Sequence, residues 1–129
     1  MGKRELYSAT ITFDSSHVLT VTFKNDVEVD LEEMIKLVDV SLEIVNGTPF
    51  YLLVDARNIL STINHDAREY ITKHKEYGRL NIAQAIIVNN MPIKILANFY
   101  MKFYKQPNPV KMFGDILEGR TWLLSQQIR

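Results

Sequence analysis

The sequence contains no cysteine, and this absence excludes thiol catalysis, disulfide bonds and thiolate metal sites. A small secreted scaffold held together by disulfides is therefore not expected. Glycine and proline are also scarce, with 5 and 4 residues, and no glycine-rich motif of the kind that cradles phosphate groups occurs. The G-x-S-x-G motif of many hydrolases is missing as well. We therefore expect neither an enzyme nor a bound cofactor.

The chain also lacks an excess of charge of either sign. Its 15 Lys and Arg residues balance 15 Asp and Glu residues, so the basic surface that nucleic-acid binding needs is not indicated. No stretch reaches the roughly 18 apolar residues of a transmembrane helix. The first residues, MGKRELYSATITF, lack the apolar region of a signal peptide. We expect a cytoplasmic protein with no nucleic-acid partner and no integral membrane segment.

What the sequence does contain is enough apolar material for one core. Of the 129 residues, 47% are hydrophobic and 23% are charged, which is typical of a soluble domain. No internal repeat, low-complexity run or long linker interrupts the chain. These features predict one domain over residues 1–129.

The first part of the chain predicts a β-hairpin followed by a helix. Apolar residues alternate with small polar residues over 7–13 and again over 19–23, which indicates two antiparallel strands. Asp30 is a suitable N-cap for a helix over 31–45, where apolar residues recur at helical spacing. Gly47 is expected to end this helix.

The middle of the chain alternates strands and helices. The unbroken apolar run 50–54 predicts a strand that is covered on both faces, at the centre of a sheet. Asn64 is a suitable cap for a second helix, which we expect to end at Gly78. The inner stripe of this helix consists of Ala67, Tyr70, Ile71 and His74. Residues 83–88 predict another buried strand.

The last part of the chain predicts a third helix over 92–104, a short strand over 110–113 and a terminal helix capped by Asp115. The resulting order is ββαβαβαβα. An opening hairpin followed by alternating helices and strands indicates an α/β fold, with a mixed sheet whose later strands are largely parallel.

Three stretches of the sequence resemble the SpoIIAA-like, or STAS, fold. They are YLLVDARNILSTINHDAREY, AQAIIVNN and PVKMFGDILEGRTWL. The resemblance covers nearly the whole chain and is greatest to the free-standing bacterial branch of STAS-like proteins, which are related in shape to CRAL-TRIO lipid-transfer domains. It implies a protein that binds partners and is not an enzyme.

The resemblance also implies a regulatory position, at the start of the helix after the central strand. In the anti-sigma-factor antagonists of this fold, a serine there is phosphorylated by the partner kinase. Those proteins place an Asp-Ser pair at this position, and the present chain does not. Ser61 and Thr62 are the hydroxyl residues in the corresponding stretch. They are either phosphate acceptors or loop hydroxyls that satisfy backbone groups.

Asp55 ends the central strand, at the edge where open α/β sheets place ligands. A phosphate-accepting receiver domain is not indicated, because such a domain has a helix after its first strand and this chain has a second strand there. We expect Asp55 to accept backbone N–H groups or to pair with Arg57 or Arg68. The candidate regulatory residues are Asp55, Arg57, Ser61, Thr62 and Asn64.

The three histidines, His17, His65 and His74, do not show the spacing of a zinc hydrolase, and no metal site is expected. His74 falls on the inner stripe of the second helix, which favours a hydrogen-bonded core histidine. His65 lies in the first turn and is expected to be solvated.

The predicted helix over 92–104 carries more apolar surface than one side of a sheet can cover. Its polar residues fall on one narrow stripe, and two apolar faces remain. A milder excess occurs on the helix over 31–45. The residues that we expect at an interface or a ligand groove are Leu37, Val40, Ile44, Ala97, Phe99, Tyr100, Met101, Phe103 and Tyr104. The alternative is packing against a neighbouring helix or the loop through Pro107.

Two functions follow from this surface. The first is a non-enzymatic STAS-like regulatory or protein-interaction module that forms a homodimer through the helices over 31–45 and 92–104. The second is a carrier or sensor of a small apolar or lipid-like ligand held between the helix over 92–104 and the sheet.

Overall fold

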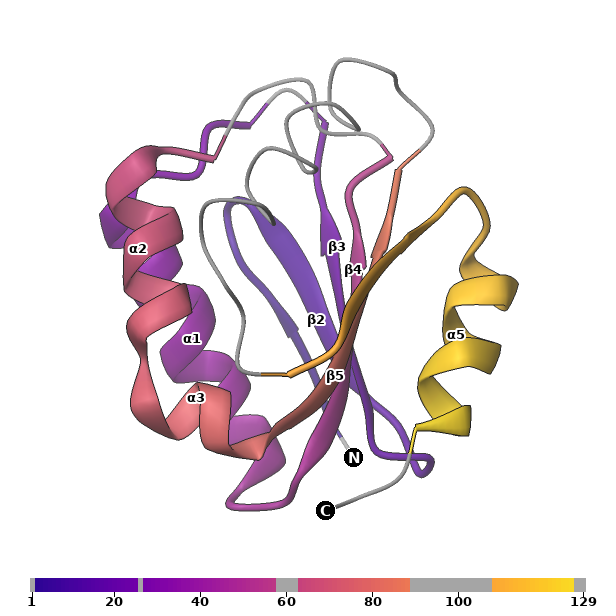
Figure 1. The fold of residues 1–129 in the computed structure, drawn as a ribbon. Helices are drawn as coiled ribbons and strands as arrows, with labels where there is room; N and C mark the ends of the chain where they lie inside the picture. Colours follow the sequence, from indigo (N-terminus) through magenta and orange to yellow (C-terminus); the bar gives the residue numbers. More distant parts are fainter. Residues whose placement is uncertain (1, 26, 58–62, 89–107, 127–129) are drawn as a thin grey trace.

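A sheet of six strands runs through the computed structural model, which describes residues 2–25, 27–57, 63–88 and 108–126 (Figure 1). The strands lie side by side in chain order. Their bounds are β1 Gly2–Glu5, β2 Ala9–Phe13, β3 Val18–Phe23, β4 Phe50–Asp55, β5 Asn81–Ile87 and β6 Val110–Phe113. The pairs β1–β2 and β2–β3 are antiparallel, whereas β3, β4, β5 and β6 are mutually parallel. The predicted mixed sheet is therefore confirmed.

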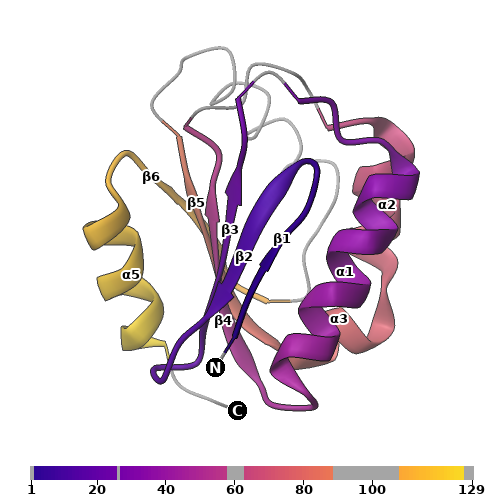
Figure 2. The ribbon, with the colours of Figure 1, turned by 180° about the vertical axis from the view of Figure 1, so that it is seen from behind.

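Strand β1 was not expected from the sequence. Its residues, GKRE, lack the apolar alternation that identifies a half-buried strand, and three of the four are exposed. Among the described strands it pairs with β2 alone, and it forms an edge of the described sheet (Figure 2). Charged residues on such an edge discourage pairing with other chains.

Helices cover both faces of the sheet. The helices α1 Leu31–Val45, α2 His65–Lys73 and α3 Lys75–Leu80 lie on one face, and α5 Ile116–Ser125 lies on the other (Figures 1 and 2). None of the helices within the described ranges is long and apolar enough to cross a membrane. The α/β fold class is as predicted.

Helix α1 begins and ends as the sequence predicts. The Asp30 carboxylate accepts the backbone N–H of Glu33 at 2.9 Å, which caps the first turn. At the other end, Asn46 and Gly47 adopt positive φ angles of 48° and 79°. Left-handed residues end a helix because they turn the chain away from its axis.

The predicted C-terminal end of the second helix, at Gly78, is wrong. The chain leaves the helical conformation at His74, with φ −72° and ψ 113°, and Gly78 lies inside α3. The Nδ1 atom of His74 accepts the backbone N–H of Tyr77 at 3.2 Å and so caps the new helix. His74 is hydrogen-bonded, as predicted, but it is half-buried and acts as a cap, so its predicted place in the core is wrong.

Strand β4 is buried on both faces, as its unbroken apolar sequence predicts. Phe50 and Leu52 join the core under α1, α2 and α3, whereas Tyr51 and Leu53 join the smaller core under α5. Two separate cores are therefore built on one sheet. Each needs its own helical cover, because a parallel strand exposes apolar side chains on both sides.

Helix α5 approaches the sheet closely at Gly119, which has no side chain. A Cβ atom at Gly119 would lie 2.7 Å from Cδ1 of Ile87 and 3.4 Å from the Cβ of Ala85. Gly119 and Ile87 are both buried. A side chain at this point would therefore require Ile87 or the helix to shift.

An ion pair ties α5 to the turn between β2 and β3. Arg120 donates from Nη1 to Oδ2 of Asp14 at 2.8 Å, and Oδ1 of Asp14 accepts the N–H groups of Ser16 and Val18. Partial burial opposes ionisation, but the hydrogen bonds from Arg120 and the two N–H groups outweigh it and lower the pKa of Asp14.

We predict that Gly119→Val lowers the free energy of unfolding by about 1–3 kcal/mol, because the added methyl groups force α5 away from Ile87. Urea denaturation followed by circular dichroism measures the loss. Gly114→Ala is the control, because a Cβ there would meet its nearest neighbour at an ordinary 3.9 Å. Equal midpoints for wild type and Gly119→Val would show that α5 does not depend on this close approach.

The Asp14 carboxylate predicts a small pH dependence of stability. Because its pKa is lower in the folded state, its contribution is present above the unfolded value of 3.8 and is lost as the pH falls through the folded value. Asp14→Asn keeps the oxygen that accepts N–H groups but removes the charge. At pH 6 we expect the free energy of unfolding of wild type to exceed that of the variant by less than about 1 kcal/mol, because Asp14 is partly exposed. The difference should shrink as the pH falls below 3.8 and vanish once Asp14 is protonated in the folded state. A difference that does not change with pH would contradict this account.

Candidate functional site

The carboxyl ends of four parallel strands meet at one edge of the sheet. Thr22, Asp55, Ile87 and Phe113 are register partners from β3 to β6 and form a row across this edge. Ligands of open α/β sheets bind beyond such an edge, since the loops that leave the strands gather there. Asp55 is the one ionisable residue in this row.

Asp55 is held by Arg57 in a two-pronged ion pair. Its Oδ1 accepts from Nε of Arg57 at 3.0 Å and from the Arg57 backbone N–H at 3.2 Å, and its Oδ2 accepts from Nη2 at 2.9 Å. Asp55 is only 5% exposed. The hydrogen bond with Asp55 raises the pKa of Arg57, and the nearby charge of Asp115 acts in the same direction. The predicted pairing of Asp55 with Arg57 is confirmed.

This arrangement favours a structural role for Asp55. Both carboxylate oxygens accept hydrogen bonds from the same neighbour, and the group is nearly enclosed. A general base or a phosphate acceptor would need a free oxygen facing the solvent. The ion pair instead stiffens the start of the segment that leads from β4 toward α2.

Asn64 fixes the other end of that segment. Its Oδ1 accepts the backbone N–H of Asp66 at 2.8 Å, as predicted for the cap of α2. Its own N–H donates to the carbonyl of Val29 at 3.0 Å, and Ile63 forms a β-bridge with Val29. The start of α2 is thus attached to the segment that precedes α1.

Several predicted site residues lie outside the described residues, and their roles remain predictions. These are Ser61, Thr62, Ala97, Phe99, Tyr100, Met101, Phe103 and Tyr104. The third predicted helix, over 92–104, also falls in this part of the chain.

The α1 residues predicted at an interface pack against the core of the protein itself. Leu37 is 2% exposed and belongs to the larger core, so its prediction as an interface residue is wrong. Val40 and Ile44 are half-buried and pack against the same core. The reason is that α1 packs on the sheet and also on α2, which covers a second side of the helix.

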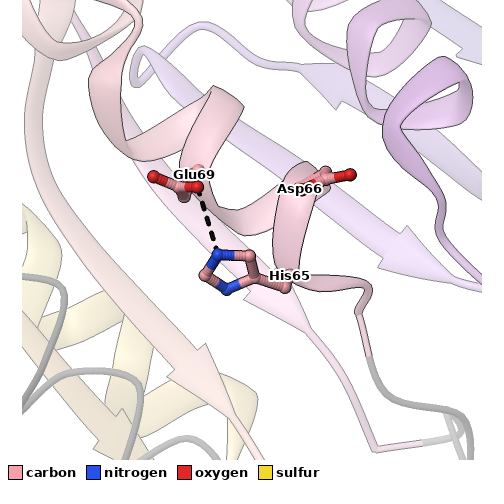
Figure 3. A group of neighbouring side chains, drawn as sticks. All are labelled: His65, Asp66 and Glu69. Carbon is pink, nitrogen blue, oxygen red and sulfur yellow. Dashed lines mark ion pairs between the residues drawn. The ribbon is translucent and has the colours of Figure 1, made fainter.

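A group of metal-ligand residues that the sequence analysis did not anticipate lies at the start of α2. His65, Asp66 and Glu69 each place one ligand atom within 4.8 Å of those of the other two (Figure 3). Nε2 of His65 lies 3.1 Å from Oε2 of Glu69, and Lys73 donates to Oε1 of Glu69 at 2.8 Å. The signal in the sequence is the four-residue spacing of His65 and Glu69, which puts both side chains on one side of a helix.

The electrostatics of this group favour an ionised Glu69. The hydrogen bond and the charge of Lys73 lower the pKa of Glu69, and His65 adds to the effect. His65 and Asp66 are exposed, and Glu69 is half-buried. The Asp66 carboxylate is therefore open to solvent, whereas each oxygen of Glu69 lies against a neighbour, Lys73 or His65.

Comparisons with known proteins show the fold. Residues 11–127 match the family described as "Domain of unknown function (DUF7793)". The chain is also similar to the crystal structure of an uncharacterized protein from the DUF3478 family, with a SpoIIAA-like fold, from Shewanella loihica PV-4. That similarity has a TM-score of 0.67 and 18% sequence identity, over 93% of this chain and 97% of the other. The predicted SpoIIAA-like fold is confirmed. No curated protein matches the chain.

We predict that Arg57→Met destabilises the protein by about 1–3 kcal/mol, because the nearly buried Asp55 carboxylate loses its partner. The cost is below that of a fully buried pair because Arg57 is 35% exposed. Urea denaturation of wild type and Arg57→Met measures this loss of stability. The double variant Asp55→Asn with Arg57→Met should recover part of the loss, since a neutral amide is easier to bury.

Arg79→Met is the matched control for this prediction, because it breaks the exposed pair of Arg79 with Glu76 and should change the stability little. If Arg57→Met were no more harmful than Arg79→Met, the ion pair at Asp55 would not stabilise the sheet edge.

Proposed function

Because the chain belongs to the family described as "Domain of unknown function (DUF7793)" and has a SpoIIAA-like fold, we propose that it is a STAS-like module. It acts by binding a protein partner and not by catalysing a reaction. The observation that carries this proposal is the state of Asp55. At the sheet edge where a reactive group would be expected, the carboxylate is enclosed and paired with Arg57.

The proposed partner is a second copy of the chain. Support comes from the sequence of residues 92–104, where helical spacing predicts an apolar face of Ala97, Tyr100, Met101 and Tyr104 beside the face expected to meet the sheet. Tyrosine and methionine are enriched at protein interfaces. Leu37 is not part of this proposal, because it is buried in the core.

Closed two-fold dimers are the commonest form of self-association, and a two-fold places the same apolar face against itself. Such an interface needs little charge complementarity. This agrees with the zero formal net charge of the chain, which neither attracts nor strongly repels a second copy.

Light scattering across a concentration series tests the proposal. We expect wild type at tens of micromolar to have twice the chain mass of 15.0 kDa. The double variant Tyr100→Glu with Tyr104→Glu should have the mass of one chain, because two carboxylates at a buried apolar contact are unfavourable. Tyr7→Glu is the control and should leave the dimer intact, since Tyr7 lies before β2 and is 72% exposed.

Two results would contradict the dimer. One is a wild-type protein that stays at 15.0 kDa over the whole series. The other is a monomeric protein that carries a copurified apolar compound in native mass spectrometry, which would favour the carrier function instead.

A further inference from the structure

We propose that His65, Asp66 and Glu69 form a binding site for a divalent transition-metal ion on the outer side of α2 (Figure 3). All three residues come from the first part of one helix. Glu69 lies four residues after His65 and three after Asp66, so it is a helical neighbour of both. The folded helix therefore brings three donors of the right types together.

The distances suit a single ion. Metal bonds of about 2.0–2.2 Å to nitrogen and oxygen place two ligand atoms about 3.4 Å apart in a tetrahedral site. The Nε2 atom of His65 and Oε2 of Glu69 are already 3.1 Å apart. The three ligand atoms lie within 4.8 Å of one another, and Asp66, which points away from the other two in Figure 3, must turn toward them to bind the same ion. Water molecules can take the remaining positions, since the group is at the surface.

The mixture of donors selects the class of ion. One imidazole with two carboxylates suits zinc, copper, nickel or cobalt, whereas magnesium and calcium prefer oxygen donors alone. The two carboxylates give the site the negative charge that a divalent ion requires. Asp66 and Glu69 also line an open surface hollow together with Tyr70, Lys73 and His74.

Lys73 opposes metal binding, and this opposition gives a testable consequence. Its ammonium group donates to Oε1 of Glu69 at 2.8 Å and competes with an ion for that carboxylate. The positive N-terminal end of α2 acts in the same direction. We therefore expect a site of moderate affinity, in which removal of the Lys73 charge strengthens binding.

A bound ion would brace the first turn of α2. The bridge from His65 to Glu69 spans one helical turn, directly after the Asn64 cap that is attached to Val29. The ion binds the folded helix and not the unfolded chain, so it should raise the unfolding temperature as its concentration increases.

Zinc chloride titration of the untagged protein, followed by isothermal calorimetry, tests the site. We expect one ion per chain with a dissociation constant below about 100 µM. His65→Gln and Glu69→Gln should each weaken binding by about tenfold or more, and Lys73→Met should strengthen it several-fold. Glu76→Gln is the control, because it removes an exposed carboxylate of α3 that pairs with Arg79, and should leave binding unchanged.

NMR of wild type provides a readout that does not depend on variants. The ring signals of His65 should shift on addition of zinc, with smaller changes at His17 and His74. The proposal is overturned if zinc binds only at millimolar concentration, if His65→Gln binds as tightly as wild type, or if another histidine responds in place of His65.

Discussion

The burial of β4 and β5 on both faces is the constraint on which the rest of the structure depends. Parallel strands with apolar side chains on both sides cannot face water, so the chain must supply helices to each face. Among the described helices, α1, α2 and α3 pack on the larger core and α5 packs on the smaller one. Helix α5 lies close to the sheet where Gly119 meets Ile87.

The same constraint places the polar groups at the ends of the strands. Asp55 follows an apolar strand and is itself nearly buried, so its charge requires a partner, and Arg57 provides one two residues later. Both oxygens of this carboxylate accept hydrogen bonds from Arg57, so Asp55 does not present a free group at that edge of the sheet. Under the proposed function, binding takes place at surfaces away from this carboxylate. The start of α2 is one such surface, where His65, Asp66 and Glu69 follow the cap Asn64, whose backbone N–H donates to the carbonyl of Val29.

The differences between expectation and structure have physical causes. His74 fits the apolar stripe of a continuous helix, but its ring accepts the N–H of Tyr77, and this local hydrogen bond starts a new helix. Leu37 lies off the main stripe of α1, yet it is buried, because α2 packs beside α1. Periodicity describes the width of an apolar face, but it does not show which neighbours cover it. Strand β1 has no apolar pattern because it is a charged edge.

Much of the fold was determined by the sequence itself. The caps Asp30, Asn64 and Asp115, the alternation in the hairpin and the apolar run of β4 are local features, and local hydrogen bonding and burial are enough to produce the elements they predict. The pairing of Asp55 with Arg57 is equally local. Contacts between distant residues were decided only by the tertiary structure. Examples are the attachment of Arg120 to Asp14 and the buried Glu33 that accepts from Ser8. Such contacts depend on how helices pack on the sheet, and no short-range pattern in the chain encodes that packing.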